Sequence, residues 1–306
     1  LYEIVRLKNK VVGIPGVGLI VDLNGNKFSL NAWATSLDGY KNLIKLASIG
    51  WTNRYQDSDV EFPSLNLEQI QELKKDIVFG VPGVNGPIAS LLISRQLNEA
   101  KAYIDLLSKS LDIRLELAAI DVHKYFDSAI GFTGYNVEGG NIQKRINQFY
   151  WSVAKEKNIK CVPVSDCHYI DPSDKIVQDA ISKNSYKDAR YFFETRNVLK
   201  AKHLYSVLKG HLGNDMSESD FRSMVQNTHD IMHKASAIKV KYEYSLPKID
   251  IPADIASRTD DYNLQCYYVT MQKIKEHGRW NDSPEYVSRF KKEIEVVMKN
   301  LSLIHI

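Results

Sequence analysis

The chain has 306 residues, of which 44% are hydrophobic and 25% charged, an ordinary globular composition with room for one sizeable core and an appendage. Its formal net charge of +3 does not by itself argue for a nucleic-acid partner, because such partners are met by local clusters of positive charge. No stretch approaches the roughly 18 apolar residues of a membrane span, and the first residues do not resemble a signal peptide, so we expect no membrane partner.

Cysteine usage excludes two further classes. Cys161, Cys167 and Cys266 are far apart and form no CxxC pair. We therefore expect neither a disulfide framework nor a structural zinc site, and a reducing cytoplasm fits this pattern. The sequence contains no internal repeat and no low-complexity run, so its organisation has to come from hydrophobic periodicity.

Short β-rich runs alternate with helical periods along the first two thirds of the chain. The runs cover residues 11–23, 77–80, 113–120 and 161–165. Apolar residues recur at helical spacing over residues 100–111 and 142–153, and Asn66 followed by Gln69 predicts a capping box. Strand–helix alternation implies parallel strands with crossover helices, and therefore an α/β barrel or a doubly wound sheet.

The pattern changes after about residue 215, where the strands stop. Helices are expected over residues 220–239, 261–276 and 284–300, with an extended, proline-containing linker over residues 242–252. The sequence therefore predicts a barrel-like domain followed by a helical connection.

The best local sign of chemistry follows the strand at residues 161–165. Asp166 and His168 are two residues apart, so an extended backbone places both side chains on one face. A carboxylate and an imidazole at the carboxyl end of a barrel strand can share a divalent metal. The pair is a weak signal alone, since a buried hydrogen-bonded pair or a helix cap explains it equally simply.

A second candidate region is a basic stretch over residues 183–211, in which aromatic residues are interleaved. Lysine and arginine beside aromatic rings suit a phosphate backbone with stacked bases. The alternative is a solvated charged face with its aromatic residues in the core. The candidate nucleic-acid contacts are Lys183, Lys187, Arg190, Arg196, Lys200 and Lys202.

The segment SDCHYIDP at residues 165–172 resembles the TNDVHYL segment of the polymerase and histidinol phosphatase (PHP) domain in C-family DNA polymerases. Other family motifs have counterparts in the same order along the chain. They are DGYKNLIKL (38–46), RLEL (114–117), QNT (226–228), LPKI (246–249) and the helix at 286–300. The last two favour a polymerase over a free-standing phosphatase, which would not continue into them.

The resemblance implies a PHP-type distorted (β/α) barrel over residues 1–240, incomplete at its N-terminus, and a helical connection towards the polymerase palm over residues 241–300. It implies a bacterial or phage DNA polymerase III alpha subunit as the parent protein, a nucleotidyltransferase that uses Mg²⁺. The implied partners are a DNA template-primer, a sliding clamp and a proofreading exonuclease.

The resemblance also predicts what this chain lacks. The HxH and TDHG-like motifs of the family should precede residue 1, and the palm aspartates should follow residue 306, so we expect the fragment itself to be inactive. Ile20 stands where the family has a glutamate ligand. His123 could replace a histidine expected after the RLEL strand, or be an exposed loop residue. We therefore expect the Zn²⁺ or Mn²⁺ site at Asp166, His168 and His123 to be degenerate.

Two interpretations of other kinds remain open. The chain could derive from a metal-dependent phosphoesterase, either a proofreading 3′–5′ exonuclease or a free PHP phosphatase, or from a non-catalytic replisome adaptor. Residues 301–306 read LSLIHI, the translation of a transposase adapter used in library preparation. We interpret this tail as a sequencing artefact, and a natural apolar tail is the alternative.

Overall fold

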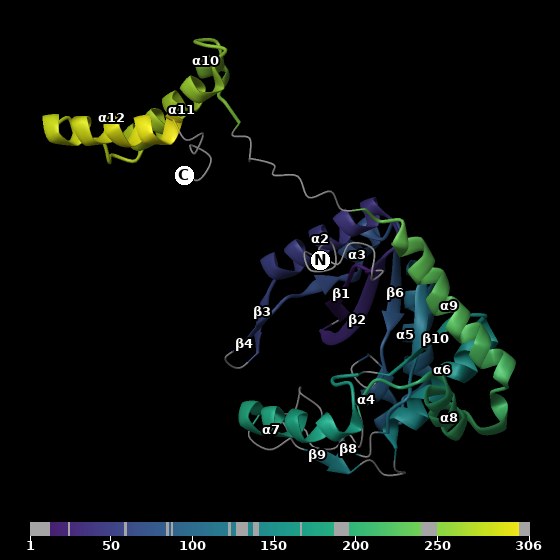
Figure 1. Ribbon diagram of the computed structural model, residues 1–306. Coiled ribbons are helices and arrows are strands. Elements are labelled where there is room, and N and C mark those ends of the chain that lie inside the picture. Colours follow the sequence, from purple (N-terminus) through teal and green to yellow (C-terminus); the bar gives the residue numbers. More distant parts are fainter. Residues whose placement is uncertain are drawn as a thin grey trace. The chain divides into compact units, whose positions relative to one another are not determined.

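The computed structural model describes residues 13–23, 25–57, 60–83, 86, 88–121, 124–126, 134–136, 141–165, 167–186, 196–239 and 250–299 (Figure 1). The chain divides into two compact units, Leu1–Val240 and Lys241–Ile306. In the described ranges, no helix is both long and apolar enough to cross a membrane.

The first unit is built on a six-stranded sheet with the order β10-β7-β6-β2-β1-β5. The strands are β1 (Gly16–Leu23), β2 (Asn26–Ala34), β5 (Leu65–Asn66), β6 (Ile77–Val81), β7 (Ile113–Ala118) and β10 (Cys161–Val164). Neighbouring strands are parallel except at β2, which is antiparallel to both β1 and β6. The predicted α/β class is confirmed with a mainly parallel sheet, and closure into a barrel stays a prediction.

The four predicted β-rich runs correspond to β1, β6, β7 and β10. β6 and β7 are buried along their whole length, as expected for central strands covered on both faces. β2 was not among the predicted strands. It pairs with β1 through a tight turn, in which the N–H of Gly25 donates to Asp22 Oδ1 at 2.8 Å. Gly25 has a φ of +84°, which glycine adopts at little cost.

Successive residues of the strands face two different sets of neighbours. Leu30, Phe79 and Leu115 are fully buried in the main hydrophobic core. Val78 and Val162 belong to a smaller cluster on the other face, where α9 lies beside β10 (Figure 1). The helices of this unit that pack with the sheet are α2 (Leu37–Thr52), α3 (Leu67–Leu73), α4 (Ile88–Ile93), α5 (Leu97–Ser110), α6 (Ile142–Lys157), α8 (Ala201–Leu212) and α9 (Glu218–Ser236).

Helices form where the apolar periodicity predicted them. α5, α6 and α9 overlap the three helices expected over residues 100–111, 142–153 and 220–239. α3 begins with the predicted capping box: the N–H of Gln69 donates to Asn66 Oδ1 at 2.9 Å, and the N–H of Asn66 donates to Gln69 Oε1 at 3.0 Å.

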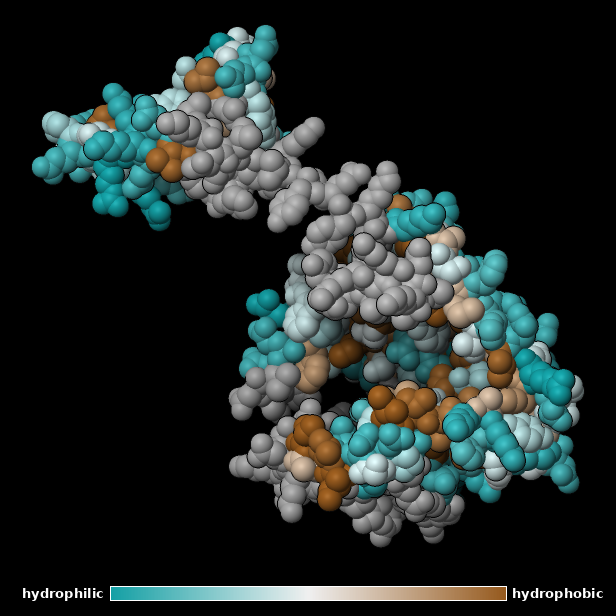
Figure 2. All heavy atoms as spheres, viewed as in Figure 1, coloured by the Kyte–Doolittle hydropathy of each residue, from teal (hydrophilic) through white to brown (hydrophobic). Residues whose placement is uncertain are grey.

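Smaller elements complete the first unit. They are the strand pairs β3 (Tyr55–Asp57) with β4 (Val60–Phe62) and β8 (Lys124–Phe126) with β9 (Gly134–Asn136), the 3₁₀ turns η2 (Pro172–Asp174) and η3 (Gly213–Asp215), and helix α7 (Lys175–Tyr186). The side chains of Ile176, Val177 and Ile181 on α7 are exposed. Figure 2 shows apolar surface in the part of the view where Figure 1 places this helix.

The second unit contains α10 (Ala253–Ala256), α11 (Tyr262–Glu276) and α12 (Pro284–Lys299). The helices predicted over residues 261–276 and 284–300 are therefore confirmed. Cys266 and Ile294 are buried between α11 and α12, with Tyr267 and Phe290 packed against them. The predicted linker over residues 242–252 falls mostly on residues 240–249, which lie outside the described residues.

Candidate functional site at the carboxyl ends of the parallel strands

The carboxyl ends of β6, β7 and β10 lie side by side, because these strands are neighbours and run parallel. Each is followed by a short connection: Pro82 and Gly83 after β6, Asp121 after β7, and the segment with His168 after β10. Functional side chains gather at the carboxyl ends of parallel strands, so a functional site is expected at this edge of the sheet.

His168 is exposed and held by Arg196. Arg196 Nη1 lies 2.8 Å from His168 Nε2, and the N–H of His168 donates to the carbonyl of Arg196 at 2.7 Å. A guanidinium has only donors, so Nε2 must accept, which places the imidazole proton on Nδ1. The contact joins two residues for which we predict different roles, a metal ligand and a nucleic-acid contact.

Of the three predicted metal ligands, His168 is the one that the structure describes. Asp166 and His123 lie outside the described residues. Among the residues that the structure does describe, no three His, Cys, Asp or Glu side chains come together as metal ligands would. Ile20, at the position of a family glutamate, is an aliphatic residue within β1 that pairs with Ser29 and offers no lone pair. Among the described residues, His168 Nε2 already accepts from Arg196, so His168 does not fit a metal ligand through this nitrogen.

A partly buried group of polar residues that the sequence did not predict lies behind the end of β7. We call it the β7 polar cluster, and it consists of Asp121, Asn141, Gln143, Asn147 and His211. Gln143 and Asn147 are fully buried on one face of α6, and His211 of α8 is 5% exposed. The cluster therefore joins two helices to the strand end through polar contacts.

Hydrogen bonds fix the state of His211. Its Nε2 donates to Asp121 Oδ1 at 2.9 Å, and its Nδ1 accepts from Asn147 Nδ2 at 2.8 Å. Asn147 Nδ2 also donates to the carbonyl of Ala118, and Asn141 Nδ2 donates to Asp121. Burial lowers the pKa of His211, against the attraction of Asp121. The imidazole is therefore neutral at pH 7, and both of its nitrogens are hydrogen-bonded.

The sequence carries one sign of this cluster. Leu204, Leu208 and Leu212 are at helical spacing, and His211 falls on the same side of α8 as this apolar stripe. A histidine on the apolar side of a helix predicts a buried imidazole with satisfied nitrogens. Its partners Asp121 and Asn147 are 90 and 64 residues away, so spacing alone does not identify them.

A second buried polar contact lies at the end of β6. Tyr150 Oη donates to the carbonyl of Pro82 at 2.8 Å. Burial raises the pKa of Tyr150, and the negative charge of Glu116 adds to this effect. Glu116 itself accepts from Asn31 Nδ2 at 2.8 Å. Tyr150 therefore stays protonated and serves as a donor that anchors α6 to the strand end.

The predicted nucleic-acid contacts are only partly described. Lys187 and Arg190 lie outside the described residues, and of Lys183 only the backbone in α7 is described. Lys200 and Lys202 are exposed at the start of α8, whereas Arg196 is half-buried. Tyr205, an aromatic residue of the same stretch, packs edge-on against the buried Phe221, with ring centroids 5.2 Å apart. For that ring, the core alternative is correct.

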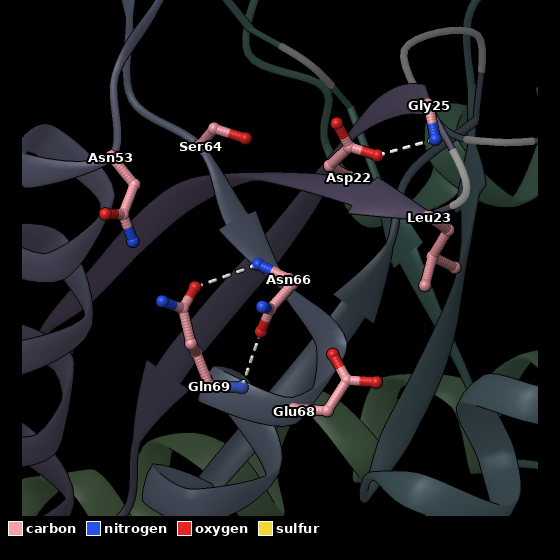
Figure 3. Close-up of a pocket in the computed structure, with 8 residues that line it drawn as sticks. All are labelled: Asp22, Leu23, Gly25, Asn53, Ser64, Asn66, Glu68 and Gln69. Carbon is pink, nitrogen blue, oxygen red and sulfur yellow. Dashed lines mark hydrogen bonds between the residues drawn. The ribbon is translucent and has the colours of Figure 1, made fainter.

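An open pocket of about 460 Å³ lies at the opposite edge of the sheet, where β1 and β5 end (Figure 3). Its polar groups already take part in local structure: Asp22 holds the turn to Gly25 and pairs with Lys27, and Asn66 and Gln69 form the cap of α3. None of the predicted site residues lines it. The lining residues are Asp22, Leu23, Gly25, Asn53, Ser64, Asn66, Glu68 and Gln69.

No family model matches the chain. It is 21% identical over 277 residues to "DNA polymerase III subunit alpha" of Aquifex aeolicus (strain VF5) and 22% identical over 278 residues to the protein of that name from Deinococcus radiodurans. It is 23% identical over 278 residues to "DNA polymerase III PolC-type" of Clostridium perfringens (strain 13 / Type A).

Over most of its length, the chain is similar to DNA polymerase III alpha subunits. The matches cover 85%, 86% and 87% of this chain and 21%, 19% and 17% of the three relatives, in the order given. The chain therefore spans about a fifth of the length of these polymerases. At 21–23% identity, this is a distant relationship to DNA polymerase III proteins, and it does not single out the PHP domain within them.

Proposed function

We propose that this chain is part of a replicative DNA-directed DNA polymerase of the DNA polymerase III alpha type. Residues 1–240 are its PHP domain, and residues 241–300 lead towards the palm. The observation that carries this proposal is the similarity to three such polymerases over 85–87% of the chain. The mixed α/β sheet of the first unit and the helices of the second are compatible with it.

The PHP domain is proposed to act as a scaffold rather than as a phosphoesterase. Two observations support this: Arg196 donates to the His168 nitrogen that a metal would need, and Ile20 offers no ligand in β1. Metal-assisted hydrolysis requires open coordination and several ligands at once. The chain's own residues would instead fix the strand ends, with Tyr150 and His211 tying α6 and α8 to β6 and β7.

The remaining parts of the proposal concern the whole parent protein. Its catalytic Mg²⁺ would bind outside this chain, and its partners would be a DNA template-primer, a sliding clamp and a proofreading exonuclease in the cytoplasm. Among the predicted nucleic-acid contacts whose side chains the structure describes, Lys200 and Lys202 are the exposed cations, and we propose that they contact the phosphate backbone.

The polymerase proposal is tested with the complete gene. The reading frame is recovered beyond residues 1 and 299, and the full-length protein is purified and assayed for primer extension with Mg²⁺. We expect extension that is lost when the carboxylates of the newly recovered palm are replaced by alanine. A frame that stops just after α12, or a full-length protein that binds a clamp without extending primers, would overturn the proposal.

The scaffold role needs a separate assay on the same full-length protein. Release of 3′-terminal nucleotides and hydrolysis of a small phosphomonoester are measured with Mn²⁺ and with Zn²⁺. We expect no hydrolysis above a metal-only blank. Metal-dependent hydrolysis that disappears in both Asp166→Ala and His168→Ala would instead favour the phosphoesterase alternative.

A further inference from the structure

The segment around Arg196 is anchored beside the end of β10 by the backbone and by one tyrosine. Tyr169 and Asn197 form a parallel bridge, and the N–H of Val198 donates to the carbonyl of Tyr169 at 3.0 Å. The N–H of Arg196 donates to Tyr169 Oη at 2.8 Å, and the N–H of His168 donates to the carbonyl of Arg196. This anchoring does not depend on the arginine side chain, which is therefore delivered to His168 by the fold.

The guanidinium occupies the position in which a metal ion would meet His168. An imidazole nitrogen binds a metal through the same lone pair that accepts a hydrogen bond, so one nitrogen cannot do both. Arg196 Nη1 is 2.8 Å from Nε2, and a guanidinium stays charged at every relevant pH. Arg196 is half-buried, which holds the side chain in place better than a fully solvated one.

We propose that Arg196 is a built-in cation that replaces a metal ion at the carboxyl end of β10. It acts as a positioning residue: it orients the His168 ring, fixes its tautomer and excludes divalent cations from Nε2. The proposal rests on the proposed PHP domain only for the expectation of a metal at this place. It is tested by metal binding and by the imidazole tautomer, so its failure is distinguishable from a failure of the polymerase assignment.

The first experiment is a Zn²⁺ titration of the purified chain by calorimetry, with a chromophoric chelator as competitor. The variants are Arg196→Met, which keeps the length of the side chain without donors, His168→Ala, and the two combined. Arg222→Ala is the matched control, because that arginine is exposed and pairs only on the helix surface with Glu218. Melting curves of each variant establish that it is folded.

We expect Arg196→Met to bind Zn²⁺ at least tenfold more tightly than the wild type and to lose this gain in the double variant, with Arg222→Ala unchanged. Wild-type binding that matches Arg196→Met and disappears in His168→Ala would overturn the proposal. So would an Arg196→Met variant that folds and gains no affinity, or a gain that survives in the double variant.

A second measurement uses the wild type and does not depend on a variant that folds. Long-range ¹H–¹⁵N correlation spectra distinguish the two neutral tautomers of histidine. We expect His168 to carry its proton on Nδ1 in the wild type and to lose this preference in Arg196→Met. A wild-type His168 with its proton on Nε2 would exclude the hydrogen bond from Arg196 and with it the proposal.

Discussion

Replacing His211 by alanine tests whether the β7 polar cluster stabilises the first unit. The change removes the hydrogen bonds of His211 to Asp121 and Asn147. It also leaves a cavity, because the imidazole that it removes is only 5% exposed. The Asp121 side chain is 41% exposed and can hydrogen-bond to water in the variant, so losing its bond to His211 contributes little to the loss of stability. Asn147 is fully buried, and a buried donor that loses a partner costs about 1–3 kcal/mol. With about 1 kcal/mol for the cavity, the loss is about 2–4 kcal/mol.

The same residue gives the stability a pH dependence with a defined sign. Burial lowers the pKa of His211 in the folded state from its ordinary value of 6.5, and Lys144 acts in the same direction, while Asp121 opposes both. The unfolded chain then binds the proton more readily, so the free energy of unfolding falls as pH drops below about 6.5. The loss continues until the pH reaches the lower folded-state pKa, and its slope is at most about 1.4 kcal/mol per pH unit for a single group. Above pH 6.5 the contribution is constant.

Urea denaturation at pH 7.5 and pH 5.5 measures both effects. His211→Gln is the matched control, because a glutamine amide can still donate towards Asp121 and accept from Asn147 but cannot be protonated. We expect His211→Gln to retain most of the free energy of unfolding at pH 7.5 and to lose the part of the pH dependence that comes from His211. His211→Ala should lose that part of the pH dependence and also the stability at pH 7.5. Equal stability of wild type and His211→Ala at pH 7.5, or an unchanged pH dependence in His211→Gln, would refute this account of the cluster.

Two further predictions concern close packing and thiol chemistry. Gly39→Ala should destabilise the chain by about 1–3 kcal/mol, because the new Cβ would lie 2.1 Å from the backbone oxygen of Asp76. Gly210→Ala on α8 should be neutral or stabilising, because its new Cβ would meet open space. Thermal melts in which the two variants unfold at the same temperature would contradict this. Cys167 should react rapidly with a thiol reagent in the folded chain because it is exposed, whereas Cys161 should react slowly because burial raises its pKa to about 12. Mass spectrometry of labelled peptides measures both reactions, and rapid labelling of Cys161 would count against the packing described.

Most of the helices could be predicted because each buries one face. In α5 the residues Ala100, Ile104 and Leu107 are buried, and they produce the apolar period that the sequence shows. β2 is a different case. Phe28, Leu30 and Ala32 alternate with more exposed residues after a glycine turn, a pattern typical of the second strand of a hairpin. Strand–helix alternation predicts the parallel strands of the sheet but not β2, which is antiparallel to both of its neighbours.

The site was less predictable than the fold, for a physical reason. Local spacing predicts that Asp166 and His168 lie on one side of a strand end, but it does not predict which side chains face them. Arg196 meets His168 across 28 residues, and His211 meets Asp121 across 90. Such pairs arise when connections and helices pack against the sheet, and the spacing of residues along a single sequence carries little record of that packing.

The contact between Arg196 and His168 changes how the whole basic stretch is interpreted. The Arg196 guanidinium donates a hydrogen bond to the His168 imidazole, and Tyr169 anchors the segment that carries it. Part of its hydrogen-bonding capacity is therefore used within the fold. A phosphate backbone is met best by exposed side chains that can reorient, and Lys200 and Lys202 satisfy that condition at the start of α8. We therefore infer a division of roles within the stretch: Arg196 organises the end of β10, and the lysines that follow are the better candidates for DNA. Metal replacement and DNA contact are then compatible, because they use different residues of one segment.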